Sequence, residues 1–138
     1  MRNLSFSLTT RQMRDRTKTV TRRRGTWWAS VLKPGDLVCA VEKSQGIKKG
    51  GLVRLGTIRI VSVTVEPLSC IAFCTTDGRT PPRDGETVRE GFPEMSPVDF
   101  MFMFMRHMGG TGDSLVTRIE FEHVGPARGE INQLDRRP

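Results

Sequence analysis

Two long stretches rich in β-branched and other apolar residues limit what this chain of 138 residues can fold into. Residues 52–65 and 115–124 both have the composition of β-strands, and the second stretch alternates apolar and polar side chains. Shorter strands are predicted at 3–7, 18–23 and 37–41. Short helices are predicted at 10–14, 87–91 and 97–107. The last of these has a serine cap at Ser96 and a proline, Pro97, in its first turn.

The order of these predicted elements indicates the fold class. Strands and helices do not alternate regularly, so a doubly wound parallel sheet is disfavoured. We expect instead an α+β fold, a small and mostly antiparallel β-barrel with two or three packed short helices. One domain is predicted over residues 1–124, followed by a flexible tail at 125–138. Loops are predicted at 44–51 and 74–86, where glycine, proline and charged residues gather.

All of the net charge of +7 lies in the first 24 residues, which hold eight basic side chains and one acidic side chain. Arginine makes bidentate contacts with phosphate, and the threonines between the arginines supply neutral hydrogen bonds. Two tryptophans follow and offer an indole for stacking on a base. We therefore expect RNA or a nucleotide as the partner, with a merely solvated charged surface as the alternative. The candidate ligand contacts are Arg16, Lys18, Thr19, Arg22, Arg23, Arg24, Trp27 and Trp28.

Several other classes of protein are not expected from this sequence. The longest apolar run, Phe100–Met105, is far shorter than the roughly 20 residues that cross a bilayer, so no membrane association is expected. No signal-peptide core follows the first basic residue, and three cysteines cannot all pair, which favours a cytoplasmic location. The cysteines lack the paired spacing of zinc sites, and there is no P-loop or dinucleotide-binding glycine motif. Neither a metal nor a cofactor is expected.

The helix predicted at 97–107 alternates phenylalanine and methionine over residues 100–105. A helix that is apolar around its whole circumference is normally buried on several sides. We expect this helix to belong to the core, and a homodimer formed through it is the alternative.

Residues 16–23 carry the pattern through which the chain resembles a known family. The sequence Arg-Thr-Lys-Thr-Val-Thr-Arg-Arg is similar to the Gly-x-Lys-x-x-x-x-Arg hallmark of ASCH domains, with Arg16 in place of the glycine. ASCH domains are relatives of the PUA (pseudouridine synthase and archaeosine transglycosylase) RNA-binding fold. The turn at 34–36, the segment 89–100 and the strand at 117–121 match in the same order. The chain most resembles small ASCH proteins encoded by bacteriophages and prophages.

This resemblance covers residues 3–124 and implies a PUA-like β-barrel with a cleft between the barrel and its helices. An insertion is expected at about 73–87, where the chain is longer than its relatives. Many ASCH proteins are proposed RNA binders, one group resembles a ribonuclease, and one bacterial branch hydrolyses the acetyl amide of N4-acetylcytidine. Carried over by motif, the catalytic set of that branch falls on Lys18, Thr21 and Glu90, with Glu94 as a second choice for the acid.

The chemistry of this candidate set is plausible on charge alone. Like charge from the neighbouring arginines is expected to lower the pKa of Lys18, so that its neutral amine activates the Thr21 hydroxyl. Arg23 would stabilise the oxyanion, and Glu90 would hold the substrate or pass a proton to the leaving amine. There is a geometric objection, because residues three apart in a regular strand face opposite sides. Lys18 and Thr21 meet only if the segment bends.

Two functions therefore remain open at the level of sequence. The first is binding of RNA or a modified nucleotide in a basic cleft, which requires only the observed charge pattern. The alternative is an enzyme of the same fold, an amidohydrolase of acylated cytidine or a ribonuclease. A bacterial cytoplasm, that of the host cell if the protein is phage-encoded, is the expected location. A host protein is a further candidate partner.

Overall fold

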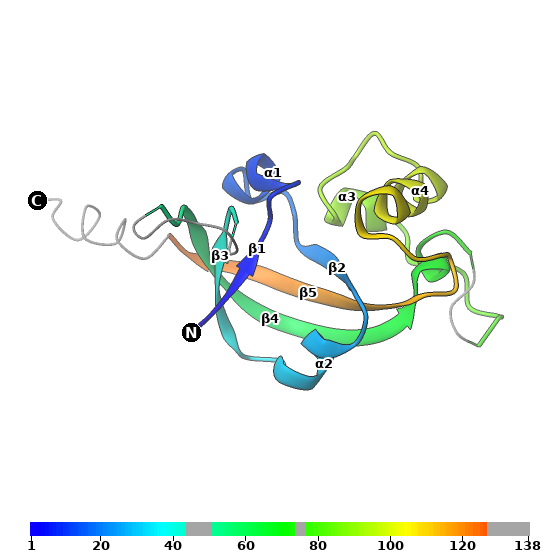
Figure 1. The fold of residues 1–138 in the computed structure, drawn as a ribbon, viewed down its shortest axis with the longest axis horizontal. Coiled ribbons are helices and arrows are strands. Elements are labelled where there is room, and N and C mark those ends of the chain that lie inside the picture. The colour runs from blue at the N-terminus through cyan, green and yellow to red at the C-terminus, as the bar shows by residue number, and fades with distance from the viewer. Residues whose placement is uncertain (44–50, 74–76, 127–138) are drawn as a thin grey trace, which may run out of the picture.

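Five strands form a mixed sheet in this computed structural model, which describes residues 1–43, 51–73 and 77–126 (Figure 1). The strands lie in the order β1-β3-β4-β5-β2. They span Arg2–Ser5 (β1), Val20–Arg24 (β2), Leu37–Val41 (β3), Arg54–Pro67 (β4) and Leu115–Gly125 (β5). Within the described residues β1 pairs parallel to β3, and the other three pairs are antiparallel. The predicted α+β class with a mostly antiparallel sheet is confirmed.

The sheet is curved but not closed. The long β4–β5 ladder shifts register twice, after Thr57 and after Ile60, and such irregularities bend a sheet. β1 and β2 are its two edge strands, and in the part of the chain that the structure describes they do not pair with each other. The side chain of Arg23 spans the gap, because its Nη2 donates a hydrogen bond to the carbonyl oxygen of Ser5. The predicted barrel is therefore a half-barrel.

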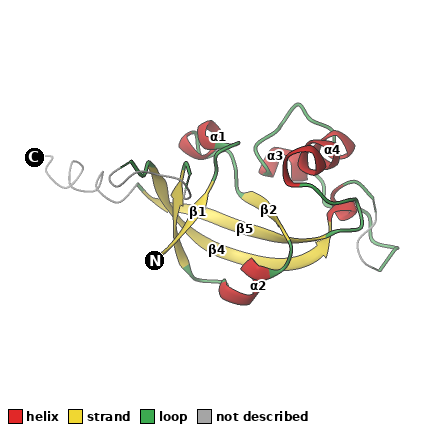
Figure 2. Ribbon diagram, viewed as in Figure 1, coloured by secondary structure: helices red, strands yellow, loops and turns green. Residues whose placement is uncertain are grey.

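Helices cover both sides of the sheet. They span Thr10–Arg14 (α1), Trp27–Val31 (α2), Glu86–Arg89 (α3) and Pro97–Met108 (α4), with a 3-10 turn, η1, at Leu68–Ile71. Figure 2 shows α1, α3 and α4 on one side of the long strands and α2 on the other. The start of α4 is as predicted, because Ser96 Oγ accepts a hydrogen bond from the Asp99 backbone nitrogen at 3.1 Å.

The buried apolar side chains form two clusters. One packs α1 and the edge strand β1 on the sheet and consists of Leu4, Phe6, Met13, Leu32, Val38, Ala40, Ile58, Ile60, Ile119 and Phe121. The other packs α4 on η1 and β5 and consists of Leu68, Ile71, Phe100, Met101, Phe104 and Val116. The prediction that α4 belongs to the core is correct for one face only, since Phe102 is 55% exposed. In Figure 1, β2 passes between α1 and the α3–α4 pair.

Some elements differ from their prediction, and other predictions concern residues that the structure does not describe. Trp27 and Trp28 lie in α2, a helix that the sequence did not predict. The loop predicted at 74–86 ends before Glu86, which begins α3 and is buried. Gly125, predicted to begin the tail, is the last residue of β5, and most of the predicted tail lies outside the described residues. Residues 44–50, 74–76 and 127–138 are not among those described, and the insertion at 73–87 stays a prediction.

Among the described residues, no helix has the length and apolar character that crossing a membrane would require.

Candidate functional site

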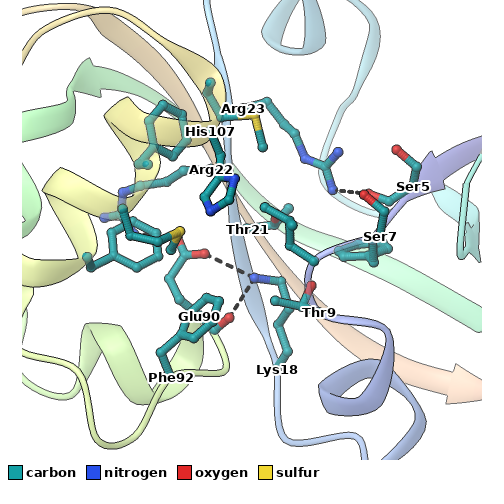
Figure 3. A pocket seen from close by; sticks show the side chains of 16 residues that line it. Ser5, Ser7, Thr9, Lys18, Thr21, Arg22, Arg23, Glu90, Phe92 and His107 are labelled. Carbon is teal, nitrogen blue, oxygen red and sulfur yellow. Dashed lines mark hydrogen bonds and ion pairs between the residues drawn. The ribbon is translucent and has the colours of Figure 1, made fainter.

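A pocket of about 240 Å³ opens between the end of β1, strand β2 and helix α4 (Figure 3). One wall is polar and is formed by Ser5, Ser7, Thr9, Lys18, Thr21, Arg22, Arg23 and Glu90. The opposite wall is largely apolar and is formed by Phe92, Phe100, Met103, Phe104, His107 and Met108. The three residues of the candidate catalytic set therefore line one pocket.

The geometric objection to this set does not apply, because Lys18 is not part of a regular strand. Arg16 has a left-handed backbone with a φ of 61°, and the backbone nitrogens of Thr17 and Lys18 both donate to the carbonyl oxygen of Gln12. Lys18 thus precedes the regular strand, which starts at Val20. The family glycine that Arg16 replaces would adopt this conformation without steric cost.

Lys18 is buried, and its ammonium nitrogen contacts Glu90 twice. Lys18 Nζ lies 2.6 Å from the Glu90 carbonyl oxygen and 3.0 Å from Glu90 Oε1. Burial lowers the pKa of Lys18 from its ordinary value of 10.5, the Glu90 carboxylate opposes this shift, and Arg23 and Arg22 add to it. The predicted direction is confirmed, but burial rather than the arginines is its main cause.

Glu90 has both carboxylate oxygens occupied. Oε1 accepts from Lys18, and Oε2 accepts from Arg22 Nη1 at 2.8 Å. The next residue, Gly91, has a φ of 97°, and a Cβ there would lie 2.9 Å from Gln12 Cγ. Glycine thus allows the chain after α3 to approach α1 closely enough for Gln12 to donate to the Gly91 carbonyl oxygen. Glu90 holds Lys18 in place, whereas its predicted roles were to hold the substrate or to transfer a proton.

A buried charge network lies behind the pocket, and the sequence did not reveal it. Arg22 Nη2 contacts Glu86 at 2.6 Å and Glu66 at 3.3 Å, and Arg118 makes two hydrogen bonds to Glu86. These contacts hold the pKa of Glu86 near 2, although burial alone would raise it. The partners come from β2, β4, α3 and β5, so no local spacing could have indicated them.

This network changes the interpretation of Arg22. Its side chain is 0% exposed and is paired with three glutamates, Glu66, Glu86 and Glu90. A guanidinium in this position has no surface to offer to a phosphate. Arg22 lines the pocket, but its guanidinium is held by glutamates and fixes Glu90, so its predicted contact with the ligand stays a prediction.

The other predicted ligand contacts are dispersed. Arg16 and Arg24 are exposed, and Arg24 donates to the carbonyl oxygen of Met108. Thr19 exchanges backbone hydrogen bonds with Arg89 and Phe121 and does not line the pocket.

The two tryptophans and the second-choice acid also lie away from the pocket. Trp27 and Trp28 pack edge to face on α2, and neither lines the pocket. Glu94 lines a separate groove together with Arg11 and Asp99. His107, predicted only to end a helix, lines the pocket from the last turn of α4.

The described residues contain no group of three or more histidine, cysteine, aspartate or glutamate side chains arranged to hold a metal ion.

Comparison with known proteins identifies the fold. No family model matches the chain, and neither does any curated protein. A crystal structure from Enterococcus faecalis V583, of the DUF984 family model, matches with a TM-score of 0.58 and 14% identity over 91% of this chain and 80% of that chain. A crystal structure of an ASCH domain from Lactobacillus crispatus JV V101 matches with a TM-score of 0.53 and 12% identity, covering 89% and 79%.

These matches show that the chain has an ASCH-type fold, as its resemblance to ASCH domains predicted. Likeness at such low identity concerns the fold alone. The phage origin stays a prediction.

Proposed function

We propose that this chain, which has an ASCH-type fold, is an amidohydrolase that removes the acyl group from an acylated nucleoside of the N4-acetylcytidine kind. One observation carries the proposal: Lys18, Thr21 and Glu90 line the same pocket, and the amine of Lys18 is buried against Glu90. The pocket volume of about 240 Å³ suits a small molecule or a single base better than a length of RNA backbone.

The contacts of Lys18 give its neutral amine a defined orientation. A neutral amine has two N–H groups and one lone pair, and Glu90 offers two acceptors, its carbonyl oxygen and Oε1. With both N–H groups donated to Glu90, the lone pair is directed away from that residue. Figure 3 shows Glu90 and Thr21 on different sides of the Lys18 amine. The lone pair is thus available to accept the proton of the Thr21 hydroxyl.

The reaction proceeds in two steps, transfer of the acyl group to Thr21 and hydrolysis of the resulting ester. Lys18 takes the Thr21 proton, Thr21 Oγ attacks the acyl carbonyl carbon, and the C–N bond breaks as Lys18 returns the proton to the leaving amine. The acyl group is then an ester of Thr21. A water molecule, deprotonated by Lys18, attacks this ester and releases a carboxylic acid and free Thr21. Amide and water are thereby converted to amine and carboxylic acid.

Binding of RNA without hydrolysis is the second candidate, and one observation favours it. Arg11, Arg14 and Arg16 are exposed on α1 and on the turn that follows it, beside the pocket lysine in the sequence. Against it, Lys18 and Arg22 are neutralised by glutamates, so the basic segment offers fewer free cations than its charge of +7 indicates.

Incubation with N4-acetylcytidine and detection of cytidine by mass spectrometry tests the proposal. Thr21→Val, nearly isosteric at this buried position, is expected to reduce turnover by about a thousandfold or more, whereas Thr21→Ser keeps the nucleophile and retains activity. Absence of turnover by the unmodified protein would refute the amidohydrolase. RNA affinity and its dependence on salt then test the second candidate.

A further inference from the structure

Arg23 is the one cation of the pocket's polar wall for which the described residues provide no acidic partner. It follows Thr21 by two positions in β2, so both side chains leave the strand on the same face. Its Nη2 donates to the Ser5 carbonyl oxygen, and its guanidinium carbon lies 5.0 Å from the centre of the Phe6 ring. Its Nε is buried and makes no hydrogen bond with any described residue.

This arrangement contrasts with that of its neighbour. Arg22 is fully buried and three carboxylates surround it, whereas Arg23 is only partly buried and no carboxylate contacts it. A cation taken out of water without a contacting counter-ion is unfavourable, and burial lowers the pKa of Arg23 to about 10, although the charge of Glu90 opposes this shift. Arg23 still carries its charge near neutral pH, and contact with an aromatic face and one carbonyl oxygen offsets only part of the cost. An anion in the pocket would supply the missing partner.

Two neutral donors line the same pocket as this cation. Ser7 and Thr9 line the same pocket from the segment that joins β1 to α1 (Figure 3). Within the described residues, neither hydroxyl makes a hydrogen bond to another protein group. Hydroxyl groups beside an arginine are a common set of donors for phosphate or carboxylate oxygens.

We propose that Arg23, with the hydroxyls of Ser7 and Thr9, is an anion subsite, so that the natural ligand carries a negatively charged group. The nucleoside part of that ligand rests on the proposed function, but the charge does not. Arg23 and Thr21 are separated along β2 by about 7 Å, so the anion and the group facing Thr21 belong to one ligand. The charge has two chemical sources, a phosphate on the ribose or a carboxylate on the acyl group.

Calorimetric titration with three ligands tests this subsite. Cytidine is the uncharged reference, cytidine 5′-monophosphate carries the phosphate, and N4-succinylcytidine carries the carboxylate. The unmodified protein is expected to bind at least one charged ligand about tenfold or more tightly than cytidine. Arg23→Gln should bring that ratio close to one, because it removes the cation from the subsite. Arg14→Gln removes the same charge from an exposed position outside the pocket and should preserve the ratio.

The pattern of Kd values decides among the outcomes. Preference for the monophosphate assigns the subsite to a ribose phosphate, and preference for the succinyl compound assigns it to the acyl group. Equal Kd values for all three ligands in the unmodified protein overturn the proposal, as does a preference that survives Arg23→Gln. If circular dichroism shows Arg23→Gln to be unfolded, Ser7→Ala, at an exposed position, decides in its place. An unchanged ratio in Ser7→Ala then overturns the proposal.

The same data separate this inference from the proposed function. A charge preference that depends on Arg23, without hydrolysis of N4-acetylcytidine, supports the anion subsite and refutes the amidohydrolase. Hydrolysis of N4-acetylcytidine without any preference for a charged ligand supports the amidohydrolase and refutes the anion subsite.

Discussion

Lys18 and Glu90 are 72 residues apart in the sequence, yet Lys18 Nζ lies 2.6 Å from the Glu90 carbonyl oxygen and 3.0 Å from its Oε1. The backbone contact fixes the position of the amine, and the carboxylate contact adjusts its pKa. A lysine held in this way can alternate between charged and neutral forms without moving. The pH dependence of the proposed reaction should therefore report on this pair.

We expect kcat/KM for N4-acetylcytidine to rise with pH through a pKa below 10.5, because only the neutral amine of Lys18 accepts a proton. Glu90→Gln removes the charge that raises this pKa, so the acidic limb should move to lower pH. Arg23→Gln removes a charge that lowers it, so the limb should move to higher pH. Steady-state rates over a pH series measure all three profiles. A shift of both variants in the same direction would contradict the assignment of Lys18.

The sequence predicted correctly those elements that depend on local turn and capping residues. β3 was predicted at 37–41 and forms there, and the Ser96–Pro97 start of α4 was correct, because turn and capping preferences act within a few residues. The half-barrel was not predictable in this way. Its openness depends on β1 pairing with β3 rather than with β2, and that is a choice among distant partners.

In the candidate site, too, local patterns were visible in the sequence and contacts between distant residues were not. Lys18, Thr21 and Glu90 came from resemblance to a motif, and their convergence depends on Lys18 lying before the regular strand and on its contact with Glu90, 72 residues away. Arg118 belongs to a strand that alternates apolar and polar side chains, and the alternation alone gives it no buried partner. It is buried because α3 places Glu86 over it, a contact between residues 32 positions apart.

Removal of Arg22 should destabilise the protein more than any loss of a surface charge. Arg22→Met leaves Glu66, Glu86 and Glu90 without their shared cation, and we expect a loss of about 3–5 kcal/mol in the free energy of unfolding. Arg59→Met is the matched control, because Arg59 pairs with Glu122 at the surface and its loss should cost about 1 kcal/mol or less. Urea unfolding measures both. Similar losses for the two variants would show that the network contributes little.

Glu86 should make the fold sensitive to acid. Its pKa is about 2 in the folded protein and 4.5 ordinarily, so between these values the unfolded chain binds more protons than the folded one. The free energy of unfolding should therefore decrease as pH falls from about 4.5 towards 2. Glu86→Gln should be less stable at neutral pH and should lose part of this dependence. Glu122→Gln, at an exposed position, should keep it, and urea unfolding at several pH values distinguishes the two.

Gly91 should couple the backbone after α3 to the position of Glu90. Gly91→Ala introduces a Cβ at a φ of 97° and 2.9 Å from Gln12 Cγ, so α1 and the chain after α3 must move apart. Gly25→Ala imposes a similar φ of 82° where nothing lies within 4 Å, so it carries the backbone strain without the collision. Both should lose about 1–2 kcal/mol of stability from strain. Only Gly91→Ala should also reduce kcat for N4-acetylcytidine, because displacing Glu90 misplaces the Lys18 amine. Equal kcat values in the two variants would show that the approach of Gly91 to α1 does not hold the site together.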